Sequence, residues 1–217
     1  MFRRHYLSGK IDEETGEVTI TGLRPAGYIT PHSLTDESAY QWVYMRVDEI
    51  VIPNEIDGHP VTRILRDAFS CRKKIEGGET GYVSTTKRVV IGDNVQEIES
   101  SAFEELPYLQ SVSFGKSLRV IGDSSFRDCY ALESVTFGEN LEMIGEHAFG
   151  NCPRLREIQS WGNHLREIHA FAFHDITGIT DGITLVMPPL PKTIALIDVA
   201  AFASSSVKSL VILNNVY

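Results

Sequence analysis

The feature that most constrains this chain is an internal repeat of 23 residues. Three units follow one another without a gap, beginning at Thr86, Leu109 and Leu132. A fourth unit from Leu155 carries one extra residue before Leu165, and outlying copies read EIVIPNEIDGHPVTRILRDAFSC and ITLVMPPLPKTIALIDVAAFASS. Repeats of about 20–50 residues are typical of architectures in which each unit stacks on its neighbours. The repeat therefore predicts a solenoid.

An isoleucine and a phenylalanine stand five residues apart in all six copies. The pairs are Ile64/Phe69, Ile98/Phe103, Ile121/Phe126, Ile144/Phe149, Ile168/Phe173 and Ile197/Phe202. Each unit opens with alternating apolar residues such as Val112 and Phe114, which predicts a short strand with one buried face. After the isoleucine, Asp123 is placed to cap a single helical turn. The sequence thus predicts an α/β solenoid with one curved parallel sheet and short helical or 3₁₀ turns on its convex side.

Stacking would place equivalent apolar residues of successive units in ladders. The expected ladders are Val89/Val112/Val135/Ile158, Val95/Leu118/Leu141/Leu165, the six isoleucines and the six phenylalanines. An end coil leaves an apolar face uncovered, so both ends need a cap. We assign residues 1–48, in which EVTITGL reads as a strand after the turn DEETG, to an N-terminal cap region. Residues 49–217 form a solenoid of about six units, ending in a strand over 207–213, and the whole is one continuous domain.

The units match a known repeat pattern. The leucine-rich repeat scheme L-x-x-L-x-L-x-x-N is occupied by Leu132, Val135, Phe137 and Asn140. The FGxxLxxIGxxAFxxC core at 137–152 and VIPNEIDGHPVTRI at 51–64 resemble BspA-type (Treponema-type) bacterial leucine-rich repeat proteins, over about residues 49–213. The resemblance implies a non-enzymatic protein without cofactors. Members are commonly exported surface proteins implicated in adhesion to host matrix proteins or other cells, and the family has no fixed set of binding residues.

Charge and hydropathy restrict the partners. The formal net charge of −9 opposes binding to the phosphate backbone of nucleic acid, and no basic stripe compensates for it. No run of about 18 apolar residues could span a membrane. The start, MFRRHYLSGKIDEETG, has two arginines but no apolar stretch after them, so no signal peptide is expected in the chain as it stands. Localisation therefore stays open between the cell surface or secretion, as the resemblance implies, and the cytosol.

One short motif suggests a phosphate-binding loop. Residues 115–117 read Gly-Lys-Ser, but position 110 holds Gln where that loop requires Gly. The neighbouring units carry Gly-Asp-Asn at 92–94 and Gly-Glu-Asn at 138–140, so the glycine recurs and the lysine does not. We interpret the motif as a structural turn.

Cysteine and histidine residues could also carry chemistry. Cys129 and Cys152 share their repeat position with Leu106 and Ile176, which predicts a buried apolar slot rather than a reactive thiol. Four histidines fall close together in the sequence: His147, His164, His169 and His174. They occupy different repeat positions and lack both cysteine partners and HExxH spacing, so no metal or other cofactor is predicted. Whether their side chains approach one another is left open.

The outward residues of the predicted strands form the candidate ligand-binding face. They are Arg88, Val90, Ser111, Ser113, Ser134, Thr136, Glu157 and Gln159. Trp161 stands where the two preceding units carry glycine. It is either an interface anchor at the edge of this face or packed over the one-residue insertion beside it. Because the face is narrower than the about 800 Å² of a usual partner, the insertions at 72–84 and 187–193 are expected to contribute.

These observations favour a recognition module that binds a protein or glycan ligand of unknown identity, and the resemblance implies an adhesin-like role at the surface of a bacterial cell. Two alternatives remain. The first is an intracellular scaffold or self-associating protein that forms a homo-oligomer through the last strand. The second is a metal-dependent enzyme that uses the histidines.

Overall fold

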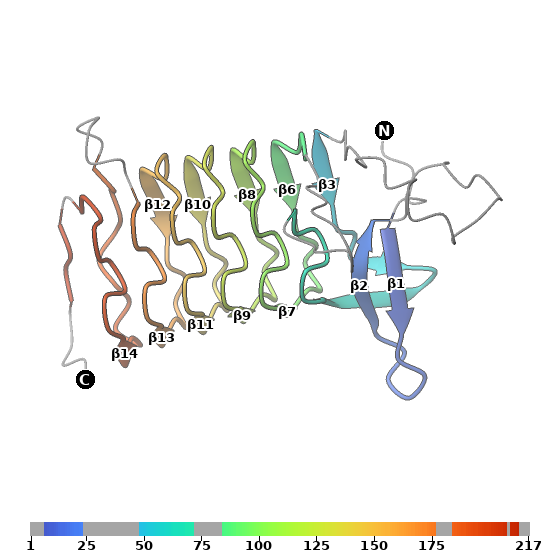
Figure 1. Ribbon diagram of the computed structural model, residues 1–217. Coiled ribbons are helices and arrows are strands. Elements are labelled where there is room, and N and C mark those ends of the chain that lie inside the picture. Colours follow the sequence, from blue (N-terminus) through green and yellow to red (C-terminus); the bar gives the residue numbers. More distant parts are fainter. Residues whose placement is uncertain (1–6, 24–47, 72–83, 177–183, 208, 213–217) are drawn as a thin grey trace.

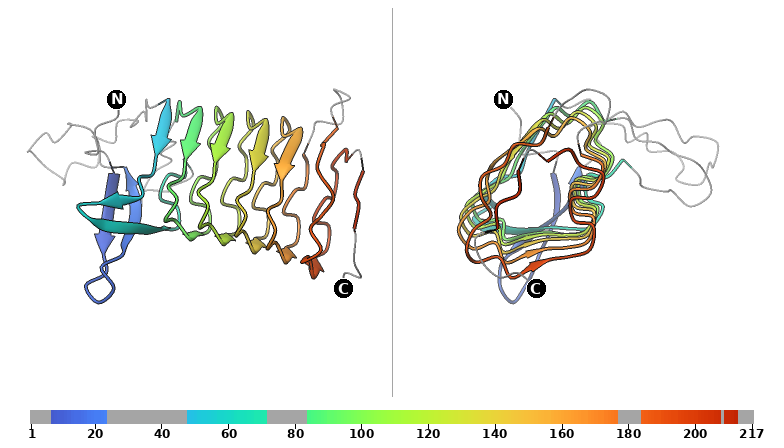
Figure 2. Two further views of the ribbon diagram at one scale, coloured as in Figure 1. Left: turned by 180° about the vertical axis from the view of Figure 1, so that it is seen from behind. Right: turned by 90° about the vertical axis from the view of Figure 1, so that its left-hand side faces the viewer.

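The chain winds into a stack of coils along one axis. The computed structural model describes residues 7–23, 48–71, 84–176, 184–207 and 209–212. A hairpin lies at the N-terminal end of the stack, and successive coils lie side by side up to the C-terminal end (Figure 1). Seen along the axis, the coils follow nearly the same path around a shared interior (Figure 2). The predicted solenoid is therefore confirmed.

A parallel five-stranded sheet forms one side of the stack, in the order β12-β10-β8-β6-β3. Its strands are β3 (Glu49–Val51), β6 (Arg88–Val90), β8 (Ser111–Ser113), β10 (Ser134–Thr136) and β12 (Glu157–Ser160). Strands β6, β8, β10 and β12 lie where the alternation predicted them. The ladder Val89/Val112/Val135/Ile158 points inward from these strands and is buried. The sequence pattern of period two thus correctly identified this sheet.

A second sheet of nine strands corrects the expectation of a single curved sheet. Its path is β1-β2-β5-β7-β9-β11-β13-β14, with β4 paired to β5. The strands are β1 (Leu7–Ile11), β2 (Val18–Leu23), β4 (Glu55–Ile56), β5 (His59–Ile64), β7 (Glu97–Ile98), β9 (Val120–Ile121), β11 (Met143–Ile144), β13 (Glu167–Ile168) and β14 (Leu196–Ile197). In this sheet the last five strands, β7, β9, β11, β13 and β14, have two residues each. Each of them ends on the isoleucine of an Ile–Phe pair. Strands this short carry no alternation to recognise in a sequence.

The segments after these isoleucines are turns, and the described residues contain no helix. The predicted helical or 3₁₀ turns, and with them the α/β class, are therefore wrong for this part of the chain. Ser124 and Asp128 have φ of 55° and 60°, in the left-handed region that a right-handed helix excludes. Asp123 does not cap its own turn, because its Oδ1 accepts the N–H of Glu146 in the next coil over 2.8 Å. Backbone bonds between coils replace those within a helix.

Buried ladders fill the space between the two sheets. The six phenylalanines form one column, with neighbouring ring centroids 5.0, 5.1, 5.4, 5.3 and 5.3 Å apart and planes 5–7° apart. The rings of Phe103 to Phe173 are fully buried, whereas Phe202 at the end is partly buried. The ladder Val95/Leu118/Leu141/Leu165 is fully buried too. All the predicted ladders are confirmed, with exposure increasing only at the last coil.

The β1–β2 hairpin covers the N-terminal end of the nine-stranded sheet. Asp12 N donates to Glu17 O over 2.9 Å across the predicted turn, where Gly16 has φ 72°. Strand β2 confirms the strand predicted in EVTITGL, and it pairs in parallel with β5. Strand β1 was not predicted. The division of the chain at residues 48 and 49 stays a prediction.

The C-terminal end differs from the predicted last strand over 207–213. Val207 makes one isolated bridge to Leu185, and residues 209–212 form no strand. Among the described residues, Ser206 O accepts the N–H of Leu185 and Val211 O that of Leu190, so the segment after Ser204 lies along the last coil. None of the described segments is a helix long and apolar enough to cross a membrane.

Candidate functional site

The outer side of the five-stranded sheet carries eight of the nine predicted face residues. Ser111 lies opposite Ser134 and Ser113 opposite Thr136 across β8 and β10, in register. The side chains exposed on this face include Arg88, Ser113, Thr136, Glu157 and Gln159, and those of Val90, Ser111 and Ser134 are half-buried. The structure thus brings these residues together in two short rows.

Hydrogen bonds fix both ends of this face. Arg88 Nε lies 3.2 Å from Glu49 Oε1 at one end. Thr136 Oγ1 donates to Gln159 Oε1 over 2.7 Å at the other, and Gln159 Nε2 donates to Glu157 Oε2 over 3.3 Å. The hydroxyl groups of Ser111, Ser113 and Ser134 have no partner within the described segments. The centre of the face can therefore donate and accept hydrogen bonds without breaking an internal contact.

Trp161 does not belong to this face, which corrects its proposed role as an anchor. Its side chain is 2% exposed, and its Nε1 donates to Pro188 O over 3.0 Å. The strand register shifts so that Thr136 pairs with Ser160, which places the extra residue at Gln159. Trp161 therefore corresponds to Phe137, on which it stacks at 5.7 Å, and not to the following glycine.

The structure describes the second of the two predicted insertions but only the last residue of the first. Residues 72–83 of the first lie outside the described residues. The second, 187–193, packs onto the last coils: Leu190 is buried, and Pro188 supplies the carbonyl that binds Trp161. This segment borders the five-stranded sheet at β12, where Val186 bridges to Glu157.

Two of the four histidines meet. His147 Nδ1 lies 3.3 Å from His174 Nδ1, which lies 3.0 Å from Phe171 O. We assign the proton on His174 Nδ1 to the bond with this carbonyl, which is the nearer partner. His147 Nδ1 then carries no proton, and the proton of His147 sits on Nε2, 3.5 Å from Glu146 Oε1. Phe171 stacks on His147 at 5.0 Å. Burial, and then the neighbouring His174, lower the pKa of His147.

The other two histidines have separate partners. His164 Nδ1 lies 2.9 Å from Glu139 O, and His169 Nε2 lies 2.9 Å from Glu167 Oε2. No three histidines of the described segments converge with metal-ligating geometry.

The cysteines and the Gly-Lys-Ser motif are structural, as interpreted. All three cysteines are free and buried, and burial raises the pKa of Cys152 to about 12 and that of Cys71 to about 11. At Gly115 a Cβ atom would lie 2.1 Å from Gly92 O, so only glycine permits the two coils to approach. Lys116 Nζ pairs with Asp93 Oδ2 at 3.3 Å and is exposed.

One carboxylate cluster was missed by the sequence reasoning. Glu104, Glu105 and Asp128 place oxygen atoms within 4.8 Å of one another, the single such group of three in the described segments. Asp128 is already bonded, since Asn151 Nδ2 donates to its Oδ1 over 2.6 Å and Arg127 Nε lies 3.5 Å from its Oδ2. Glu105 and Asp128 stand 23 residues apart, so the repeat alignment could have shown them as neighbours.

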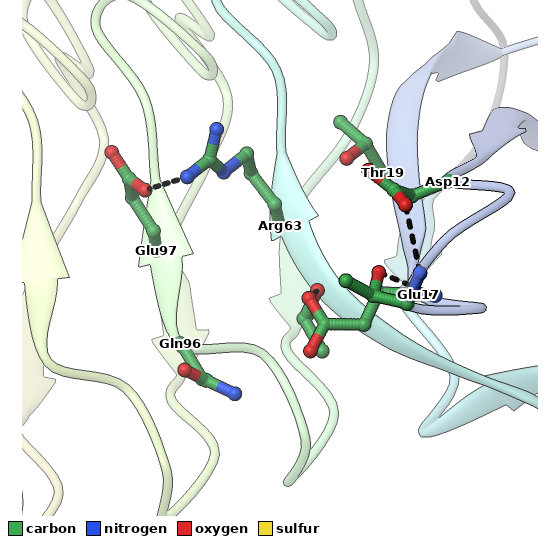
Figure 3. A pocket seen from close by; sticks show the side chains of 8 residues that line it. Asp12, Glu17, Thr19, Arg63, Gln96 and Glu97 are labelled. Atoms are coloured by element: carbon green, nitrogen blue, oxygen red, sulfur yellow. Dashed lines mark hydrogen bonds and ion pairs between the residues drawn. The ribbon is translucent and has the colours of Figure 1, made fainter.

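A polar pocket of about 230 Å³ lies where the hairpin meets the first coils (Figure 3). Its lining residues are Asp12, Thr15, Glu17, Thr19, Thr62, Arg63, Gln96 and Glu97. Thr62 Oγ1 donates to Glu17 Oε2 over 2.9 Å, and Arg63 Nη2 pairs with Glu97 Oε2 at 2.9 Å. Backbone N–H groups of Thr15 and Glu14 lower the pKa of Asp12. The bond between Thr62 and Glu17 joins the hairpin to the first coil, and that between Arg63 and Glu97 joins β5 to β7.

The stacked parallel strands and inward aliphatic and aromatic ladders define a solenoid of the leucine-rich repeat class. A family model described as "BspA type Leucine rich repeat region" matches residues 81–207 in 6 copies. This match covers more than half of the chain, and the chain belongs to the BspA-type leucine-rich repeat family. No curated protein matches its sequence.

Solved structures share this fold. The leucine-rich repeat protein of T. pallidum, TpLRR, is 18% identical, with a TM-score of 0.52 over 88% of this chain and 84% of that chain. The pneumococcal vaccine antigen PcpA is 20% identical, with a TM-score of 0.67 over 98% of this chain and 49% of that chain. A leucine-rich cell surface protein of Faecalibacterium prausnitzii is 18% identical, with a TM-score of 0.56 over 97% of this chain and 54% of that chain. The chain spans about half the length of the last two.

Proposed function

We propose that this protein is a non-enzymatic recognition module that holds a protein or glycan ligand against the outer side of its five-stranded sheet. The observation that carries the proposal is the row of small hydroxyl side chains at Ser111, Ser113 and Ser134, which have no partner in the described chain and lie on in-register strands. A rigid sheet presents such groups with little loss of conformational freedom on binding.

The size of the face favours a slender ligand. Five strands about 4.8 Å apart, each about 10 Å long, offer on the order of 200 Å². This area suits an extended peptide or an oligosaccharide, whereas a folded partner usually covers about 800 Å². A folded protein would also have to contact neighbouring segments such as 187–193.

Two observations support a non-enzymatic role. The buried cysteines, with their raised pKa, are poor nucleophiles. The titratable groups of the polar pocket are bonded to one another and to the backbone. An adhesin-like role at the cell surface is part of the proposal, supported by the description of the Faecalibacterium protein as a cell surface protein.

A binding screen against matrix proteins and a glycan array tests the proposal. We expect at least one ligand whose affinity falls about tenfold or more when Ser113→Arg and Thr136→Arg together block the face. Met143→Arg places one positive charge on the nine-stranded sheet and should leave binding unchanged, and each single variant, Ser113→Arg or Thr136→Arg, is compared with it. Equal loss in both variants would place the ligand elsewhere, and a screen without any ligand would count against recognition by this face.

A further inference from the structure

Two imidazole nitrogens face each other across the boundary between two coils. His147 lies in the turn after β11 and His174 in the turn after β13, and their Nδ1 atoms are 3.3 Å apart. Two imidazoles bound to one tetrahedral zinc ion, each at about 2.0–2.1 Å, hold their nitrogens about 3.3 Å apart. Two imidazoles at adjacent corners of the square plane that Cu²⁺ prefers would hold them about 2.9 Å apart. The spacing between the two histidines therefore fits Zn²⁺.

A carboxylate lies beside the second ring nitrogen of each histidine. Glu146 Oε1 is 3.5 Å from His147 Nε2, and Asp175 Oδ2 is 3.7 Å from His174 Nε2. In metal sites the unbound nitrogen of a histidine usually donates its N–H to such a partner, which leaves the other nitrogen free for the ion. Both histidines thus have a carboxylate on the side that would carry the proton, and both turn their Nδ1 atoms toward the same place.

Zinc binding requires a lone pair on both Nδ1 atoms. His147 Nδ1 already carries no proton, whereas His174 Nδ1 donates to Phe171 O over 3.0 Å. When the ion binds, the ring of His174 stays neutral and its proton moves to Nε2, beside Asp175. The Phe171 carbonyl loses its donor in this step, so its oxygen becomes available as a third ligand, and water completes the tetrahedron. The carboxylates of Glu146 and Asp175 offset the charge of the ion.

The two histidines lie where the repeat departs from its own pattern. Of the six copies, only the one that contains Gly150 has glycine six residues after its isoleucine. A Cβ atom at this position would lie 2.6 Å from His174 Nδ1 and 2.4 Å from its Cε1, so glycine makes room for the ring. Phe171 holds the other ring, since it stacks on His147 with planes 6° apart. The side chains of His147 and His174 are 28% and 18% exposed, so an ion can reach them from solvent.

We propose that His147 and His174 bind one zinc ion and that this ion joins their two coils. The ligands stand 27 residues apart in the chain and belong to neighbouring coils. An ion that binds only the folded arrangement stabilises the stack by mass action. The carboxylate cluster of Glu104, Glu105 and Asp128 is the rival position for a cation, but oxygen ligands favour calcium and magnesium, whereas imidazole favours zinc. The zinc site does not depend on the ligand proposed for the five-stranded sheet.

Calorimetric titration of the full chain with ZnCl₂, without a histidine tag and after treatment with a chelator, tests the site. We expect one Zn²⁺ per chain, with an affinity that falls about tenfold or more in His147→Gln and in His174→Gln. His164→Gln removes an exposed imidazole elsewhere and should keep the wild-type affinity, as should Glu105→Gln. A wild type that titrates like the double variant His147→Gln/His174→Gln would overturn the proposal. Loss of binding in Glu105→Gln alone would place the ion at the carboxylate cluster and overturn it too.

Urea unfolding with and without Zn²⁺ tests whether the ion joins the coils. Saturating Zn²⁺ should raise the urea midpoint of the wild type and of His164→Gln, and it should leave that of His147→Gln unchanged. Mg²⁺, which prefers oxygen ligands, should shift none of them. Circular dichroism in the absence of metal checks that all variants fold. An equal shift in the wild type and His147→Gln, or no shift in the wild type, would refute a zinc link between the coils.

Discussion

Phe126 stacks on Phe149 with ring centroids 5.4 Å apart and planes 6° apart. Near-parallel rings at this separation are offset from each other, which is one of the arrangements that aromatic pairs favour, and it fits the spacing of adjacent coils. Phe114 adds an edge-to-face contact to Phe126 at 5.7 Å. The aromatic column therefore couples each coil to both neighbours.

Phe126→Ala should lower the free energy of unfolding by about 3–5 kcal/mol, because a cavity opens between two fully buried rings. Phe202→Ala is the matched control at the partly buried end of the column and should cost clearly less. Urea unfolding of both variants gives the comparison. A loss of under about 1 kcal/mol at Phe126, or equal losses at both sites, would refute the column as a main source of stability.

Periodicity predicted the inward-facing residues well. The ladders, the strands β6, β8, β10 and β12 and the turn at 115–117 follow from side chains that recur at fixed positions. Hydrogen bonds between coils produce no recurring residue type in the sequence, because they join backbone groups that almost every residue has. The two-residue strands of the nine-stranded sheet and the non-helical turns therefore went unpredicted.

The candidate site was predicted to a similar extent. Alternation gave the outward positions of β8 and β10, but it could not place the extra residue at Gln159, which decides that Trp161 is buried. The sequence left open whether His147 and His174 meet, for another reason. These residues occupy different repeat positions in adjacent coils. Their rings therefore meet across the boundary between the coils, and not in a ladder of equivalent residues.

The left-handed turns predict how substitutions at Ser124 affect stability. Its φ of 55° is costly for a β-branched side chain and free for glycine. Ser124→Val should lower the free energy of unfolding by about 1–2 kcal/mol, and Ser124→Gly should not lower it by more than about 0.5 kcal/mol. Ser113→Val on the extended strand β8 serves as the control and should be near neutral. Chemical unfolding measures all three, and a tolerated valine at 124 would contradict the turn.

The burial of His147, together with its contact with His174, predicts a loss of stability in mild acid. The pKa of His147 is lowered in the folded chain, so the unfolded chain binds the proton first as the pH falls. Stability from this group is complete above the ordinary pKa of about 6.5 and declines as the pH drops through it. Unfolding at about pH 7.5 and about pH 5.5 should show a decrease that is smaller in His147→Gln. His164→Gln should keep the wild-type decrease; a wild-type slope in His147→Gln would exclude this origin.

The cysteine slots predict that thiol chemistry is coupled to unfolding. Cys129 and Cys152 are fully buried, and burial raises the pKa of both. A thiol reagent should therefore modify the native protein only at the rate of opening and all three cysteines at once in denaturant. Mass spectrometry of the labelled sites makes the measurement. Rapid labelling of Cys152 in native buffer would show that its slot is open.

Each inner coil binds both of its neighbours through the backbone. Phe126 N donates to Ala148 O of the next coil, for example, and Gly145 N of that coil donates back to Ile121 O. This pattern affects how the molecule can vary in length. Every inner coil offers the same donors and acceptors on its two faces, so a duplicate of residues 132–154 could be inserted between its neighbours with all bonds remade. Each insertion would lengthen the protein by about 4.8 Å. Duplication of the gene segment that encodes one repeat would therefore change the length of the solenoid by one coil. The contacts between the other coils would stay the same.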